Sequence, residues 1–156
     1  MSKPTNVVIA GLGGQGVLKA SDILADVVFS SGLDIKKSEV HGMSQRGGSV
    51  CSDVRFGERV FSPMVPEGEA DFLLVIAPDQ VEVNRAALRH QGGVLIEPAQ
   101  IDEARLSNKK SINVALLGVL SRHLPFPLEA WTAALERNLP AKLHEANLRS
   151  FAIGRG

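Results

Sequence analysis

A short apolar strand that ends in a glycine-rich turn and continues into a helix constrains the fold of this chain more than any other feature. Residues 6–10 (NVVIA) are apolar and β-branched, as in a strand that is buried on both faces. The turn 11–16 (GLGGQG) follows, and apolar residues then recur at helical spacing until Ser31-Gly32. Strand, glycine turn and helix together indicate the beginning of a β-α-β unit.

The remaining patterns extend this beginning into an α/β domain. Further segments alternate or are continuously apolar in the manner of strands, at residues 33–40, 49–56, 59–62, 72–77 and 94–97. The pair 49–56 and 59–62 flanks Gly57-Glu58, which suits a two-residue hairpin turn. A helix is expected from Asp79 to Gly92-Gly93, and the chain is helical from residue 113 onward.

These elements predict a three-layer, Rossmann-like α/β fold with a mostly parallel sheet, an antiparallel hairpin and a C-terminal helical tail. A length of 156 residues is enough for a single domain, so we expect residues 1–156 to form one unit.

Composition excludes several classes of function. The 17 basic and 17 acidic residues balance, which does not favour nucleic acid as a partner. Cys51 is the only cysteine, so this chain alone cannot hold an iron–sulfur cluster or a four-thiolate zinc site. No apolar run reaches the roughly 20 residues that cross a membrane, and the first strand begins too early for a signal peptide. We therefore expect a cytoplasmic protein without a membrane partner.

The glycine turn is the first candidate binding site. Backbone amides in such a turn, and at the start of the helix after it, attract anions. Its spacing fits G-x-G-x-x-G, the pattern of dinucleotide-binding turns. The candidate residues are Gly11, Gly13, Gly14, Gln15 and Gly16.

The ribose signal that a dinucleotide site also requires is equivocal. An acidic residue is expected about 20 positions after the turn. That neighbourhood holds Lys36 and Lys37 between Asp34 and Glu39, and two lysines suit a phosphate equally well. Three interpretations stay open: a dinucleotide site, a site for another phosphorylated group, and glycines that serve only strand–helix packing.

The second candidate is the polar, glycine-bent segment S-E-V-H-G-M-S-Q-R-G-G-S-V at residues 38–50. Loops of this kind on a rigid scaffold often carry recognition, although a plain solvated connection would have a similar composition. The candidate residues of this loop are Glu39, His41, Gly42, Met43, Ser44, Gln45, Arg46, Gly47 and Gly48.

Individual side chains in and near this loop indicate which ligands and reactions it suits. Arg46 carries a fork of donors that suits a carboxylate or a phosphate. His41 has no second histidine at metal-ligand spacing, so a hydrogen bond in the loop or a partner contact is favoured over a metal or a general base. Cys51 lies on a predicted strand and is expected to be a buried bystander. We predict no catalytic residue and no metal site in this chain alone.

Several segments together resemble a known family. GLGGQG, SEVHGMSQRGGSV and ADFLLVIAP resemble the gamma-type subunits of the 2-oxoacid (pyruvate, ketoisovalerate, indolepyruvate) ferredoxin oxidoreductases, above all the indolepyruvate branch. NVALLG at 113–118 and NLRSFAIG at 147–154 resemble the closing helices of that family. The similarity covers nearly the whole chain. One departure is the short polar stretch 99–112, where the family usually has a longer strand and loop.

The resemblance implies a division of labour between subunits. Such enzymes decarboxylate a 2-oxoacid on thiamine diphosphate and pass electrons through iron–sulfur clusters to ferredoxin; some transfer the acyl group to coenzyme A. Thiamine diphosphate, magnesium and the clusters are then expected in partner subunits, and this chain alone is expected to be inactive. By the same resemblance, the turn 11–16 and the loop 39–48 face a partner or its active site, with Arg46 as an anion contact and coenzyme A as a possible ligand. A stand-alone nucleotide-binding oxidoreductase and an α/β scaffold module remain the alternatives.

Overall fold

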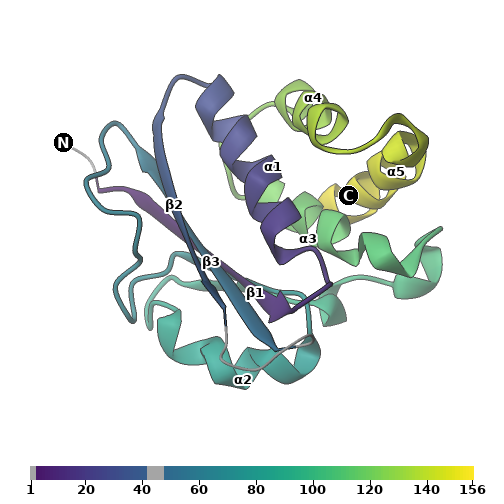
Figure 1. The fold of residues 1–156 in the computed structure, drawn as a ribbon. Helices are drawn as coiled ribbons and strands as arrows, with labels where there is room; N and C mark the ends of the chain where they lie inside the picture. The colour runs from purple at the N-terminus through teal and green to yellow at the C-terminus, as the bar shows by residue number, and fades with distance from the viewer. Residues whose placement is uncertain (1–2, 42–47) are drawn as a thin grey trace.

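The computed structural model describes residues 3–41 and 48–156, and its centre is a sheet in the order β2-β3-β1-β4-β5 (Figure 1). Along the chain the strands are β1 Thr5–Leu12, β2 Asp34–His41, β3 Ser49–Gly57, β4 Phe72–Val75 and β5 Val94–Ile96. β1, β4 and β5 pair in parallel, and β3 runs antiparallel to both of its neighbours. Four strands therefore point the same way, which confirms the mostly parallel sheet.

The antiparallel hairpin exists, but it is not the one that the sequence predicted. It joins β2 to β3, whereas residues 59–62 form no strand. The physical reason is that β3 is already paired along both edges, with β1 and with β2. The segment after Gly57 is tied down by side chains instead: Val60 N donates to Asp34 Oδ2 (2.7 Å), and Arg55 Nη1 donates to the Ser62 carbonyl (3.0 Å).

Helices cover both faces of the sheet, which confirms the three layers. The main apolar cluster joins the sheet to α1 and to the helical tail, and a smaller one joins β1 and β4 to Val81 on the opposite face. Figure 1 shows α1 and the tail on one side of the sheet and α2 on the other. The helices are α1 Val17–Ser30, α2 Val81–Asn84, α3 Ile112–Ser121, α4 Leu128–Asn138 and α5 His144–Arg155. None of the described helices is long and apolar enough to cross a membrane.

The helix expected between Asp79 and Gly92-Gly93 is much shorter than predicted. Only α2 is α-helical, between 3-10 turns at Pro78–Gln80 and Arg85–Ala87. The helix stops because the chain turns extended at Leu88 and forms a parallel bridge with Ala70, and Arg89 N then donates to the Ala70 carbonyl (2.9 Å). Sheet-type pairing outweighs the local helical pattern here. The stretch 99–112 likewise holds only short 3-10 turns, at Pro98–Gln100, Glu103–Arg105 and Lys109–Ser111.

Two glycines allow α3 and α5 to cross in close contact. A Cβ on Gly154 would overlap the Ala115 carbonyl oxygen, and a Cβ on Gly118 would overlap the Phe151 carbonyl oxygen. A hydrogen bond of 2.6 Å between the Ser111 and Ser150 hydroxyls adds a second tie between the two helices. Both glycines belong to segments that carry the family resemblance. Glycine suits these two positions because the backbones of the two helices are in contact there.

Gly154→Ala should therefore destabilise the chain by about 2–3 kcal/mol, because the added methyl meets rigid backbone and forces the two helices apart. Chemical denaturation measures this change. Gly57→Ala is the matched control: its Cβ would sit at an ordinary 3.4 Å from Pro4 Cα, and we expect a change under about 1 kcal/mol. Equal effects of the two substitutions would contradict the close helix crossing.

Candidate functional site

The glycine turn joins the carboxyl end of β1 to the first turn of α1. Gln15 closes it from inside, because its Oε1 accepts from Leu12 N (2.7 Å) while its own N–H donates to the Leu12 carbonyl (3.1 Å). Gly11 still lies within β1, whereas Gly13, Gly14 and Gly16 form the turn. The strand–turn–helix arrangement that the sequence predicted is thus present.

Gly16 is the residue on which α1 begins. Its φ of 83° is left-handed, and its carbonyl accepts the first helical bond from Ala20 N (3.0 Å). The same carbonyl accepts from Asn113 Nδ2 at the start of α3 (3.2 Å). A Cβ on Gly16 would collide with that Nδ2, so only glycine fits here, both for its backbone angle and for the space available.

The first turn of α1 carries neither a side-chain cap nor an acidic residue. The first amides of a helix, here those of Val17 and Leu18, have no intrahelical acceptor, and such amides suit an anionic or polar group. A pocket of about 250 Å³ lies beside them. Its described lining is mainly apolar, from Leu12, Val17, Leu18 and Val50, with the turn glycines and Lys19.

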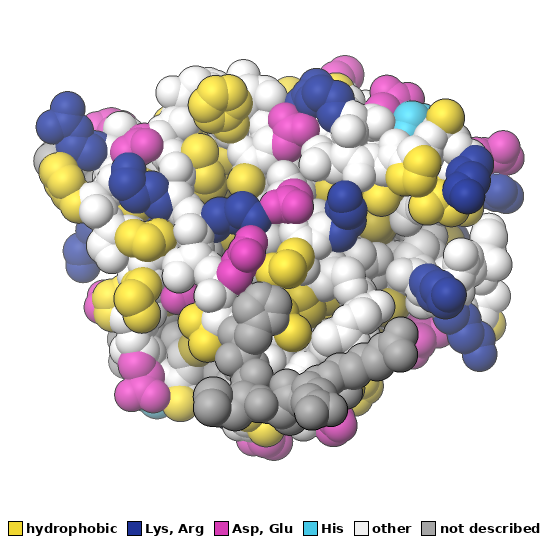
Figure 2. Space-filling model, viewed as in Figure 1, with side chains coloured by type: hydrophobic (Ala, Val, Ile, Leu, Met, Phe, Trp, Pro, Cys, Tyr) yellow, Lys and Arg dark blue, Asp and Glu magenta, His cyan; other side chains and the backbone are white. Residues whose placement is uncertain are grey.

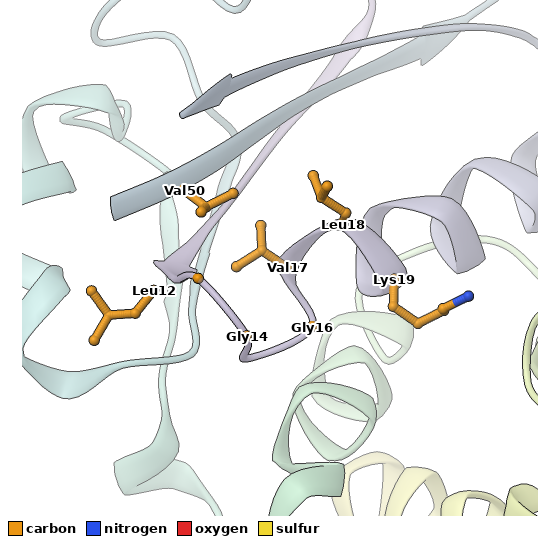
Figure 3. A pocket seen from close by; sticks show the side chains of 8 residues that line it. Leu12, Gly14, Gly16, Val17, Leu18, Lys19 and Val50 are labelled. Atoms are coloured by element: carbon orange, nitrogen blue, oxygen red, sulfur yellow. The ribbon is translucent and has the colours of Figure 1, made fainter. Parts of the chain in front are cut away.

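Lys19 does not supply a charge to this pocket. Its Nζ donates to the Asn138 carbonyl (3.1 Å) on α4. Figure 3 shows Val17, Leu18 and Val50 close together while Lys19 points away from them. Among the described residues the pocket therefore combines backbone amides with an apolar wall.

The polar loop begins and ends beside this turn. It leaves β2 at His41 and returns at Gly48, whose carbonyl accepts from Gly13 N (2.8 Å). Ser49 follows and its hydroxyl bonds to Gln80 Oε1 (2.8 Å), which follows β4. The ends of both loops thus lie together at one edge of the sheet. Six predicted residues lie outside the described part of the chain: Gly42, Met43, Ser44, Gln45, Arg46 and Gly47.

Glu39 was expected in the polar loop, but it belongs to a strand. It lies within β2, where its carboxylate pairs with Lys37 Nζ (2.8 Å), and Lys37 also pairs with Asp22 of α1. Burial disfavours the charged form of Lys37, but the bonds to Asp22 and Glu39 outweigh it and raise the pKa of this lysine. Figure 2 shows basic and acidic side chains alternating over β2 and α1. Glu39 therefore holds Lys37, and Lys37 joins the strand to the helix through Asp22.

The two lysines considered as phosphate ligands are also paired with carboxylates. Lys37 is held by its two carboxylates, and Lys36 lies 3.8 Å from Asp34 Oδ2. The sheet order adds a stronger argument against a dinucleotide site of the usual kind. β3 lies between β1 and β2, so an acidic residue on β2 is not on the strand next to the glycine turn.

Cys51 lies on β3, half-buried, close to this edge. Burial, and next the nearby Asp53 carboxylate, raise the pKa of its thiol to about 11. The thiol form therefore prevails at neutral pH, in keeping with the expected bystander role. No group of three or more metal-ligating side chains occurs among the residues that the structure describes.

Besides the predicted turn 11–16, the site includes five residues that were not predicted: Val17, Leu18, Lys19, Val50 and Asn113. Val50 and Lys19 look like ordinary strand and helix positions in the sequence. Asn113 does stand in a segment that carries the family resemblance, but nothing local connects it with a turn 97 positions away.

We expect iodoacetamide to alkylate Cys51 about a hundredfold more slowly at pH 7 in the folded chain than in urea, because the folded thiol ionises near pH 11 instead of 9.0. The folded chain keeps this proton where the unfolded chain has lost it. Stability should therefore fall as the pH rises from about 9 to about 11. Cys51→Ser, which removes the label, is the control; equal rates in the folded and unfolded chain would contradict the assignment.

Comparisons with known proteins agree with this geometry. The indolepyruvate oxidoreductase subunit IorB of Archaeoglobus fulgidus is 47% identical, and the similarity covers 96% of this chain and 92% of that protein. IorB of Thermococcus kodakarensis is 34% identical, covering 97% of this chain and 95% of that one. The latter alignment spans 197 positions, more than the 156 residues of this chain, so that relative carries segments that this chain lacks.

Solved structures share the fold. The gamma subunit of a keto/oxoacid ferredoxin oxidoreductase from Geobacter sulfurreducens superposes with a TM-score of 0.78 at 21% identity, covering 98% of this chain and 95% of that chain. The 2-oxoglutarate:ferredoxin oxidoreductase from Magnetococcus marinus gives 0.82 at 17% identity, where this chain matches 31% of the longer chain. The sequence model described as pyruvate ferredoxin/flavodoxin oxidoreductase matches residues 6–156. The chain therefore belongs to the pyruvate ferredoxin/flavodoxin oxidoreductase family.

Proposed function

We propose that this chain is a subunit of a thiamine diphosphate-dependent 2-oxoacid:ferredoxin oxidoreductase and bears none of its cofactors. It packs on the thiamine-binding subunit with the sheet edge that carries the glycine turn and the polar loop. Its role is to cover the active site there and to help hold coenzyme A. Indolepyruvate, which is named for relatives matched over nearly their full length, is the first substrate to test.

The observation that carries this proposal is the meeting of both loops at one edge. The bond from Gly13 N to the Gly48 carbonyl (2.8 Å) holds the glycine turn against the return of the polar loop. Sequence-distant loops at the carboxyl ends of strands are where α/β sheets bind their ligands. The matched relatives are single subunits of comparable extent, which favours assembly with other chains.

The residues at this edge fit the uncharged arm of coenzyme A better than its negatively charged part. Free amides at the start of α1 suit a phosphate oxygen or a carbonyl, and the apolar wall of Val17, Leu18 and Val50 suits an uncharged arm. Among the described residues no cation points into the pocket, so Arg46 remains the proposed partner for negative charge. When bound, coenzyme A would supply the thiol that accepts an acyl group.

The two alternatives have less support. A stand-alone nucleotide-binding oxidoreductase requires a ribose contact on the strand beside the turn, and β3 occupies that place. A pure scaffold module would have no need for a turn with free helix amides beside a pocket. One cysteine cannot ligate a cluster, which supports the proposal that the redox centres lie in other chains.

We expect the purified chain to be colourless and inactive, and to form a brown complex with the thiamine-binding subunit of its own organism. That complex should reduce ferredoxin with indolepyruvate and coenzyme A; absorption spectra, size exclusion and ferredoxin reduction test this. A flavin or nicotinamide spectrum of the chain alone would favour the stand-alone enzyme. Failure to bind any thiamine-binding partner would favour the scaffold.

Arg46→Ala should leave the fold intact and lower kcat/KM for coenzyme A of the complex by about tenfold or more, as expected when one charge-assisted hydrogen bond is lost. Arg149→Ala is the matched control, because Arg149 is an exposed arginine on α5 that pairs only with Glu145 among the described ion pairs. Wild-type kcat/KM in the Arg46→Ala complex would contradict the proposed contact.

A further inference from the structure

The side chain of Asn113 makes a direct hydrogen bond from the helical tail to the glycine turn. Among the described residues it is the only such bond. Its Nδ2 donates to the Gly16 carbonyl at 3.2 Å, across 97 positions of sequence. The asparagine is only 7% exposed, so this bond is protected from water. It reaches the carbonyl that also accepts the first hydrogen bond of α1.

The contact between Asn113 and Gly16 is steric as well as polar. The Asn113 amide occupies the space that a Cβ on Gly16 would need. It therefore packs against the inner side of a residue whose φ of 83° sets the direction of the first α1 amides. A shift of this side chain would free Gly16 to move and would redirect those amides.

Asn113 is itself held in place by the packing of α3. It lies in the first turn of α3, directly after Ser111, which bonds to Ser150 of α5 (2.6 Å). Further along, the backbone of Gly118 on α3 lies against α5, and the backbone of Gly154 on α5 lies against α3. The amide thus reaches the turn from a rigid helix pair, which is what a residue needs to fix the geometry of another segment.

We propose that Asn113 is a positioning residue: it fixes the glycine turn in the conformation that binds at the sheet edge. It touches no ligand itself and acts through the Gly16 carbonyl. The inference rests on the proposed function, because that function supplies the ligand of the turn. The geometric half, that Asn113 holds the turn, can be tested on the isolated chain.

Asn113→Asp separates this role from a contribution to helix stability. Aspartate keeps the size of asparagine but places an oxygen against the Gly16 carbonyl, so the bond is replaced by repulsion. A negative charge in the first turn of α3 is otherwise favourable for the helix. The aspartate variant should therefore disturb the turn without unfolding the tail.

Asn147→Asp is the matched control. Asn147 is 8% exposed, lies in the first turn of α5, and donates its Nδ2 to a backbone carbonyl, that of Leu143, at 2.9 Å. The substitution removes the same kind of bond at the same burial and adds the same charge near a helix start. Its acceptor, however, lies outside the glycine turn.

Two measurements decide the question. Hydrogen exchange of the isolated chain should quicken about tenfold at residues 13–19 in Asn113→Asp and Asn113→Ala, and stay unchanged there in Asn147→Asp. In the assembled complex, KM for coenzyme A should rise about five- to tenfold in both Asn113 variants while kcat stays within about twofold. Asn113→Gln, whose longer amide can still donate, should recover part of the loss.

Each contrary outcome is informative. Unchanged exchange at residues 13–19 would overturn the inference whatever the function of the chain. Quickened exchange with an unchanged KM, or an equal KM effect in Asn147→Asp, would show that Asn113 does not position the binding site. If the wild-type chain forms no complex, the proposed function fails, and the exchange experiment still judges the contact between Asn113 and Gly16.

Discussion

The pairing of β3 along both of its edges is the constraint on which the site depends. Because β3 lies between β1 and β2, the loop after β2 and the turn after β1 reach the same sheet edge, and Gly13 can bond to Gly48. The same pairing removes β2 from the place where a dinucleotide-binding fold keeps its ribose contact. This strand order thus favours two adjoining loops over a nucleotide cleft.

Much of the architecture could be predicted from sequence because it depends on local patterns. The β1–turn–α1 beginning and the helical tail both follow from apolar spacing and glycines. The predictions were wrong where the structure of a segment depends on the strand with which it could pair. Residues 59–62 have strand-like composition, yet neither edge of β3 was free for them, and the helix after Asp79 gave way to a bridge between Ala70 and Leu88. Sequence patterns carry no information about which edges are already occupied.

The candidate site divides in a similar way. The turn glycines were found from their spacing, but the engagement of Glu39 with Lys37 was not, because ion pairs within one strand and to a neighbouring helix depend on where side chains point. Asn113 was beyond reach for a different reason, since its partner lies 97 positions earlier. When only a tertiary contact links two segments, the sequence of each segment alone gives no reason for the residue that makes the contact.

The close crossing of α3 and α5 also has a consequence for the order in which the molecule forms. The glycine turn is synthesised well before Gly154, which lets α5 dock on α3. Until that docking occurs, α3 lacks the support that holds Asn113 against Gly16. The early strand and helix can therefore pair before α3 and α5 dock, and the glycine turn gains its contact with Asn113 only after residues 144–155 have joined the fold.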